Sequence, residues 1–115
     1  MKPICIDANV FIASTKGNET YSSDCRRVIE AVGNGEFYLI EPTICLVSIW
    51  EICDDHFCTS AGYTGALYGI YSLDSIYLET ALRHNAVFVT LDDLDFLSRI
   101  KERVGIEVYH PKDFP

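Results

Sequence analysis

The chain has 115 residues, 49% of them hydrophobic, and its 17 acidic residues outnumber 9 basic ones, for a formal net charge of −8. We therefore expect one domain over residues 1–115, and because the apolar runs are short we expect neither a membrane span nor a signal peptide. Nucleic acid binding through clustered basic side chains alone is disfavoured, and five cysteines without a CxxC pair favour a reduced, cytoplasmic protein.

The first half of the chain begins with an apolar segment, residues 2–6, that we expect to form a strand ending at Asp7. An aspartate at this place either caps the following turn through its side chain or faces a functional site. Apolar spacing then predicts an amphipathic helix over residues 20–32. Residues 37–40 form a second expected strand, which Glu41 and Pro42 close.

The next segment, from Pro42 to about residue 56, is predicted to be a helix because Pro favours a first helical position and an apolar run follows. Glu51 is the only charged residue of the window 47–53 within it. Such an acid either lies on the exposed side of the helix or needs a partner, since burial without one is unfavourable. A second, short helix is expected near residues 66–71.

The last third of the chain has the clearest pattern. A helix is expected from Ser72, with Asp74 in its first turn, and residues 86–89 form an apolar run typical of a strand buried on both faces. Three acids follow within four positions, at Asp92, Asp93 and Asp95. A helix over residues 96–104 and a final strand over residues 106–109 complete the chain.

Strands and helices alternate along the chain, which predicts an α/β fold with right-handed crossovers and a mostly parallel sheet. All strands then end at one edge of the sheet, where ligands bind in open α/β folds. Asp7 and Asp92 lie at strand ends on that edge. Glu51 and Asp74 lie on expected helices that begin near it, so we expect the four acids to converge.

Converging carboxylates repel one another unless protons or cations offset their charge. A ligand set made only of oxygens suits Mg²⁺ or Mn²⁺, and such ions support phosphodiester hydrolysis. For each acid taken alone, a solvated surface position is the competing interpretation, and for Asp74 it is the usual preference for acids at a helix start.

The chain resembles the PIN domain nucleases and, within them, the VapC-like toxins of toxin–antitoxin pairs. The resemblance runs in order through ICIDANVFI, Glu51, DSIYLETA, VFVTLD and GIEVYHP, and it spans nearly the whole chain. It implies a three-layer α/β/α sandwich around a central, mostly parallel sheet of four or five strands.

The resemblance also implies a function: metal-dependent cleavage of single-stranded or structured RNA, with Mg²⁺ or Mn²⁺ as cofactor. The metal-binding acids of the family fall on Asp7, Glu51, Asp74 and Asp92, with Asp95 as a supplementary acid. Asn9 and Thr90 fall on positions that shape the site. Members of the family commonly form homodimers, and a small antitoxin protein inhibits the toxins.

Two other functions compete with the nuclease. One is a PIN-like module without catalysis that binds RNA or a protein, which agrees with the scarcity of basic residues. The other is a phosphoacceptor receiver domain, which also has acids at strand ends. A receiver domain needs paired acids just after the first strand and a lysine at a late strand end, and Asp7–Ala8–Asn9 and His110–Pro111 supply neither.

Overall fold

The structure, a computed structural model, describes residues 1–42, 50–51, 54–70, 72–92 and 94–115. For residues 50, 51, 55, 72, 73 and 94–96 it describes the backbone alone. The described strands are β1 (Lys2–Ile6), β2 (Phe37–Leu39), β3 (Glu41–Pro42), β4 (Trp50–Glu51), β5 (Val87–Val89) and β6 (Val108–Tyr109). The described helices are α1 (Ala8–Ser14), α2 (Ser22–Gly33), α3 (Asp55–Tyr68), α4 (Ser72–Arg83), α5 (Leu94–Ile100) and the 3-10 helix η1 (Pro111–Asp113).

The central sheet has four parallel strands in the order β2-β1-β5-β6. A separate pair, β3 with β4, is also parallel. The expectation of an α/β fold around a parallel sheet is therefore confirmed. No helix within the described part of the chain is long and apolar enough to cross a bilayer.

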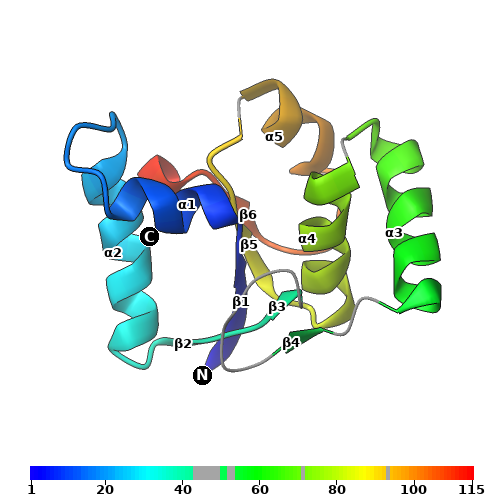
Figure 1. Ribbon diagram of the computed structural model, residues 1–115, viewed down its shortest axis with the longest axis horizontal. Helices are drawn as coiled ribbons and strands as arrows, with labels where there is room; N and C mark the ends of the chain where they lie inside the picture. The colour runs from blue at the N-terminus through cyan, green and yellow to red at the C-terminus, as the bar shows by residue number, and fades with distance from the viewer. Residues whose placement is uncertain (43–49, 52–53, 71, 93) are drawn as a thin grey trace.

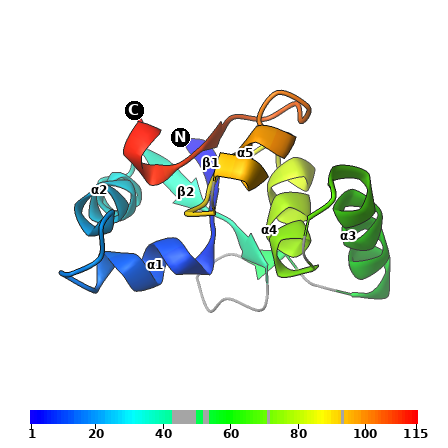
Figure 2. The same ribbon diagram turned by 90° about the horizontal axis from the view of Figure 1, so that it is seen from above.

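Helices cover both faces of the central sheet (Figures 1 and 2). Because neighbouring strand residues point to opposite faces, Ile4 and Ile6 join a core beneath α1 and α2, whereas Cys5 joins a core beneath α4 and α5. β5 alternates in the same way, with Phe88 on the α4 side. α3 lies outside these layers and packs against α4 (Figure 1).

The predicted helix from Pro42 to residue 56 is wrong at residues 42, 50 and 51, and only its last residues, 55–56, are helical. Pro42 belongs to β3, Glu51 belongs to β4, and the next helix starts only at Asp55. An unbroken apolar run looks alike in a buried helix and a buried strand, so its periodicity could not separate the two. Residues 43–49 and 52–53 of the prediction lie outside the described part of the chain.

α3 begins earlier and runs longer than expected. Asp54 caps it, since its Oδ1 accepts the Phe57 N–H at 2.8 Å, and the helix continues through Gly62. A Cβ added to Gly65 would lie 3.2 Å from the Ser75 Cβ, so glycine here allows α3 and α4 to approach closely. Gly69, with φ of 67°, ends the helix in the left-handed conformation that glycine tolerates.

Glu79 links α3 to α4. It is 9% exposed, and its carboxylate accepts hydrogen bonds from Thr64 Oγ1 at 2.7 Å and Arg83 Nε at 3.4 Å. The Arg83 guanidinium also lies 4.9 Å from the centre of the Phe57 ring. One acid of α4 thus satisfies a hydroxyl of α3 and positions an arginine over an aromatic ring of α3.

We expect Glu79→Ala to lower the free energy of unfolding by about 1–3 kcal/mol, because Thr64 and Arg83 lose a shared acceptor at the interface between α3 and α4. Urea denaturation followed by far-UV circular dichroism measures this. Glu102→Ala, at an exposed position, is the matched control and should change little. Equal stabilities of the two variants would contradict the role of Glu79.

Candidate metal site

The order of the central strands reverses at β1. The connection from β1 leads to β2 on one side, whereas β5, later in the chain, pairs with the other side of β1. In open parallel sheets, ligands bind at the carboxyl ends of strands where the strand order reverses in this way. Asp7 follows β1 directly, and Asp92 lies three positions beyond Val89, the last residue of β5.

Asp7 lies between β1 and α1, a short helix that the sequence analysis treated as a turn. Its Oδ1 accepts the Asn9 N–H at 3.4 Å, so the aspartate caps α1. Its side chain also belongs to a cluster of acids, described below. The two interpretations of Asp7 that the sequence left open are therefore both consistent with the structure. Asn9 itself is exposed.

Thr90 connects the two acids at the strand ends. Its buried hydroxyl donates a hydrogen bond to Asp7 Oδ2 at 2.9 Å and accepts the Asp92 N–H at 3.2 Å. The Thr90 N–H in turn donates to the Tyr109 carbonyl of β6 at 3.1 Å. A side chain that was predicted to shape the site thus contacts both acids and is itself fixed to the sheet.

Asp74, in the first turn of α4, completes a group of three acids. One carboxylate oxygen each from Asp7, Asp74 and Asp92 lie within 4.8 Å of one another. The structure therefore brings together three of the four acids predicted to bind metal. The side chains of the fourth, Glu51, and of the supplementary Asp95 lie outside the described part of the structure, which places their backbones in β4 and α5.

Burial and the charges of neighbouring acids raise the pKa values of Asp74 and Asp7. Desolvation raises the pKa of Asp74 to about 7, and a hydrogen bond with Asp92 and the charges of Asp92 and Asp7 add to the effect. Desolvation also raises the pKa of Asp7; the Thr90 hydrogen bond opposes this, and the Asp92 charge adds to it. Among the described residues, every charged group that shifts these two pKa values is another acid, so no basic side chain offsets the cluster.

Glu41 is an acid of this region that the sequence analysis did not select. It is fully buried, and its Oε1 accepts the Ile6 N–H at 2.7 Å, one residue before Asp7. Desolvation raises its pKa to about 8; the Ile6 hydrogen bond opposes this shift, and the Asp7 charge adds to it. The sequence does contain a pattern that could have indicated Glu41. Glu41 follows the expected strand over residues 37–40 directly, as Asp7 follows the expected strand over residues 2–6.

The chain matches no protein-family model and no curated protein. The resemblance to PIN domain nucleases therefore rests on the motifs in the sequence. What the structure adds is the placement of the residues in three of those motifs, Asp7, Asp74 and Asp92, around one point at the end of a parallel sheet.

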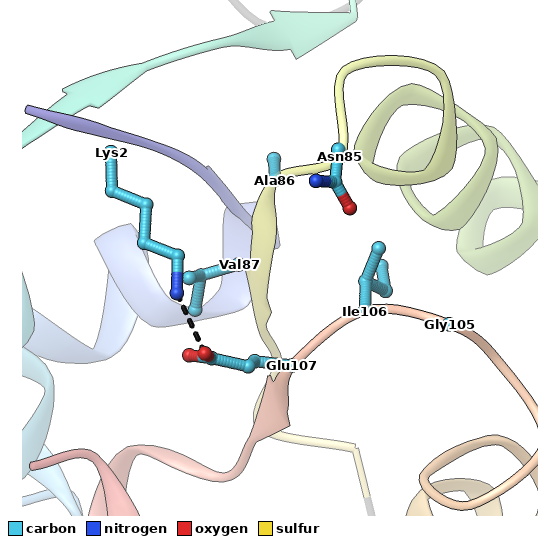
Figure 3. Close-up of a pocket in the computed structure, with 7 residues that line it drawn as sticks. All are labelled: Lys2, Asn85, Ala86, Val87, Gly105, Ile106 and Glu107. Atoms are coloured by element: carbon cyan, nitrogen blue, oxygen red, sulfur yellow. Dashed lines mark hydrogen bonds and ion pairs between the residues drawn. The ribbon is translucent and has the colours of Figure 1, made fainter.

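A pocket at the opposite edge of the sheet differs in its charges from the cluster of Asp7, Asp74 and Asp92 (Figure 3). It lies where the strands begin, and Lys2 and Glu107 form an ion pair of 2.6 Å beside it. Each charge here already has a partner of opposite sign, unlike the acids at the carboxyl edge. The lining residues are Lys2, Asn85, Ala86, Val87, Gly105, Ile106 and Glu107.

Proposed function

We propose that this protein is a Mg²⁺- or Mn²⁺-dependent endoribonuclease, in which Asp7, Asp74 and Asp92 hold the metal. The main support is the convergence of three carboxylates within 4.8 Å, at the point where the strand order reverses, with no basic residue among the described ones that shifts the pKa of Asp7 or Asp74. A divalent cation removes the repulsion among such acids and lets the phosphate of a substrate approach a chain of net charge −8.

The donor atoms fit a hard divalent cation. All three acids offer carboxylate oxygens, which Mg²⁺ and Mn²⁺ prefer over softer ligands. Asp92 Oδ2 is buried and has no hydrogen-bond partner among the described residues. A buried carboxylate oxygen in this state is unfavourable without a donor or a cation, so its place within the cluster favours metal binding over a purely structural role.

The residues around such a metal site would have different roles. Thr90 holds Asp7 and Asp92 in a fixed relation, because its one hydroxyl contacts both. Asp74 joins them from the first turn of α4. A bound Mg²⁺ or Mn²⁺ would offset the phosphate charge and make water more acidic. Glu51 stays a prediction as the fourth ligand, and Asp95 as a supplementary one.

The proposal that RNA is the substrate rests on the resemblance to PIN domain nucleases alone. The same resemblance suggests that the protein is the toxin of a toxin–antitoxin pair, that a small antitoxin inhibits it and that it forms a homodimer. These three statements are parts of the proposal that need their own tests. The alternative function, a module that binds without catalysis, is an outcome of the experiment below.

We expect the wild-type protein to bind Mn²⁺ in isothermal titration calorimetry and to cleave a generic single-stranded RNA when Mn²⁺ or Mg²⁺ is present. EDTA should stop cleavage, and the products should carry 5′-phosphate and 3′-hydroxyl ends, which ligation assays and electrophoresis identify. Asp113→Asn, which changes an exposed acid of η1, is the matched control and should behave as the wild type.

The outcomes separate the candidate functions. Metal binding and cleavage together would support the nuclease. Metal binding without cleavage of any RNA in a broad set of sequences would support the binding module instead. Absence of Mn²⁺ binding, even with RNA present, would contradict the metal site and with it the proposed function.

A further inference from the structure

Glu41 lies where two neighbouring strands separate. β2 pairs with β1 in parallel, with Leu39 opposite Ile4, and the Ile40 N–H donates to the Ile4 carbonyl at 3.0 Å. The chain then leaves β1, because Glu41 and Pro42 pair with β4 instead. At this point the next N–H that β1 directs toward β2, that of Ile6, donates to the Glu41 carboxyl group at 2.7 Å. A side chain thus takes the place of a strand carbonyl at the end of the ladder.

This contact lies directly next to the metal site. On the other side of β1, the Asp7 N–H donates to the Val89 carbonyl at 2.9 Å. The end of β1 is therefore hydrogen-bonded on both sides. The Asp7 N–H donates to Val89 of β5, and the Ile6 N–H donates to Glu41. Without the Glu41 contact, the backbone just before Asp7 would lose its hydrogen bond on the β2 side.

The burial of Glu41 is unusual for a structural hydrogen bond of this kind. The residue is 0% exposed, and its second oxygen, Oε2, has no hydrogen-bond partner among the described residues. An asparagine or serine would supply a neutral acceptor without a second buried oxygen, and long acidic side chains are rarely buried without a partner. The electrostatic effect of Asp7 on Glu41 shows that the two carboxyl groups are close enough to interact.

We propose that Glu41 is a positioning residue of the metal site, which fixes Asp7 through the Ile6 N–H. The inference depends on the proposed function, since it assigns to Glu41 a role in the site that Asp7, Asp74 and Asp92 form. Residues that orient metal ligands commonly change metal affinity by about 10- to 100-fold when they are replaced. Glu41 acts on the ligand through the backbone, whereas Thr90 acts on it through its side chain.

The test compares two replacements of Glu41. Glu41→Gln keeps the length of the side chain and an oxygen that can accept the Ile6 N–H, whereas Glu41→Met keeps the approximate size but removes the acceptor. We expect Glu41→Met to bind Mn²⁺ about 10- to 100-fold more weakly than the wild type in calorimetry. Glu41→Gln should stay near the wild-type affinity. Glu36→Met, at an exposed position before β2, is the matched control.

A second measurement reports on the contact itself, without metal or RNA. Amide hydrogen exchange, followed by NMR, should show faster exchange at the Ile6 N–H in Glu41→Met and near wild-type protection in Glu41→Gln. If Glu41→Met does not fold, Glu41→Asp replaces it, because the shorter side chain keeps the charge but reaches less far toward Ile6. Weakened Mn²⁺ binding by Glu41→Asp, together with near wild-type binding by Glu41→Gln, would then support positioning.

The remaining outcomes overturn the inference in distinguishable ways. Faster Ile6 exchange with unchanged Mn²⁺ affinity would make Glu41 a purely structural residue. Equal loss of affinity in Glu41→Gln and Glu41→Met would show that the carboxylate itself is needed and would make Glu41 a ligand. Absence of Mn²⁺ binding by the wild type would instead reject the proposed function, and the exchange measurement would still show whether Glu41 holds Ile6.

Discussion

Asp7→Asn is expected to bind Mn²⁺ at least ~100-fold more weakly than the wild type and to lose RNA cleavage to a similar degree. Orienting residues around a metal already contribute about 10- to 100-fold, and Asp7 would contact the metal itself. Its carboxylate oxygen lies within 4.8 Å of those of Asp74 and Asp92. Calorimetry with Mn²⁺ and the rate of cleavage of a labelled RNA measure the two effects.

The same variant should fold well, which makes the loss interpretable. Asparagine is as good a helix cap as aspartate, so the contact with the Asn9 N–H at the start of α1 is preserved. Removal of one charge from a group of repelling acids should also raise the melting temperature of the metal-free protein. Wild-type Mn²⁺ affinity in Asp7→Asn would contradict the assignment of Asp7, and a lowered melting temperature would mean that its structural role dominates.

The metal-free protein is expected to lose stability as the pH rises from about 6.5 to about 8. Burial raises the folded pKa of Glu41 from 4.5 to about 8 and that of Asp74 from 3.8 to about 7. In this range the folded state therefore binds more protons than the unfolded state, and the free energy of unfolding falls with pH. The titration of Glu41 alone should lower the free energy of unfolding by about 2 kcal/mol over this interval.

Other titrating groups define where the slope should be measured. Burial lowers the pKa of His110, which makes stability rise with pH below about 6.5 and opposes the acids there. Burial raises the pKa of Cys25 above 9.0, which makes stability fall further at higher pH. Urea denaturation at several pH values between these limits therefore isolates the acids.

Saturating Mg²⁺ or Mn²⁺ should reduce the slope, because the cation stabilises the charged form of Asp74. Glu41→Gln should also reduce it, since it removes one of the acids with a raised pKa, whereas Asp113→Asn should leave it unchanged. Stability that stays constant or rises over the same interval in the metal-free protein would contradict the raised pKa values on which the electrostatic argument for the site depends.

The acids at strand ends could be predicted from the sequence because a parallel sheet gathers the carboxyl ends of its strands at one edge. Asp7 follows a clear apolar segment, and Asp92 follows another, so the sequence alone predicts that both lie at that edge. Asp74 was placed near them by the expected start of a helix. For these three residues, the local sequence pattern and the topology of the sheet predict the same position, at the carboxyl edge of the sheet.

Glu41 and Glu79 could not be predicted in the same way, because their roles depend on partners distant in sequence. The Glu41 carboxyl group contacts Ile6, and the Glu79 carboxyl group contacts Thr64 on another helix. The predicted helix from Pro42 failed for a different reason: its apolar residues fit two kinds of buried element equally well. Strand pairing at β3 and β4 is a long-range property that no local periodicity reports.

The position of α3 has a consequence for the order in which parts of the molecule open. Its described contacts are made mainly with α4, and Tyr63 and Leu67 on it are exposed, whereas β1 and β5 lie between two cores. α3 can therefore detach in a partial opening that leaves the sheet and the acids at its edge intact. We expect α3 to open at a lower free energy than the centre of the sheet and the acids at its edge.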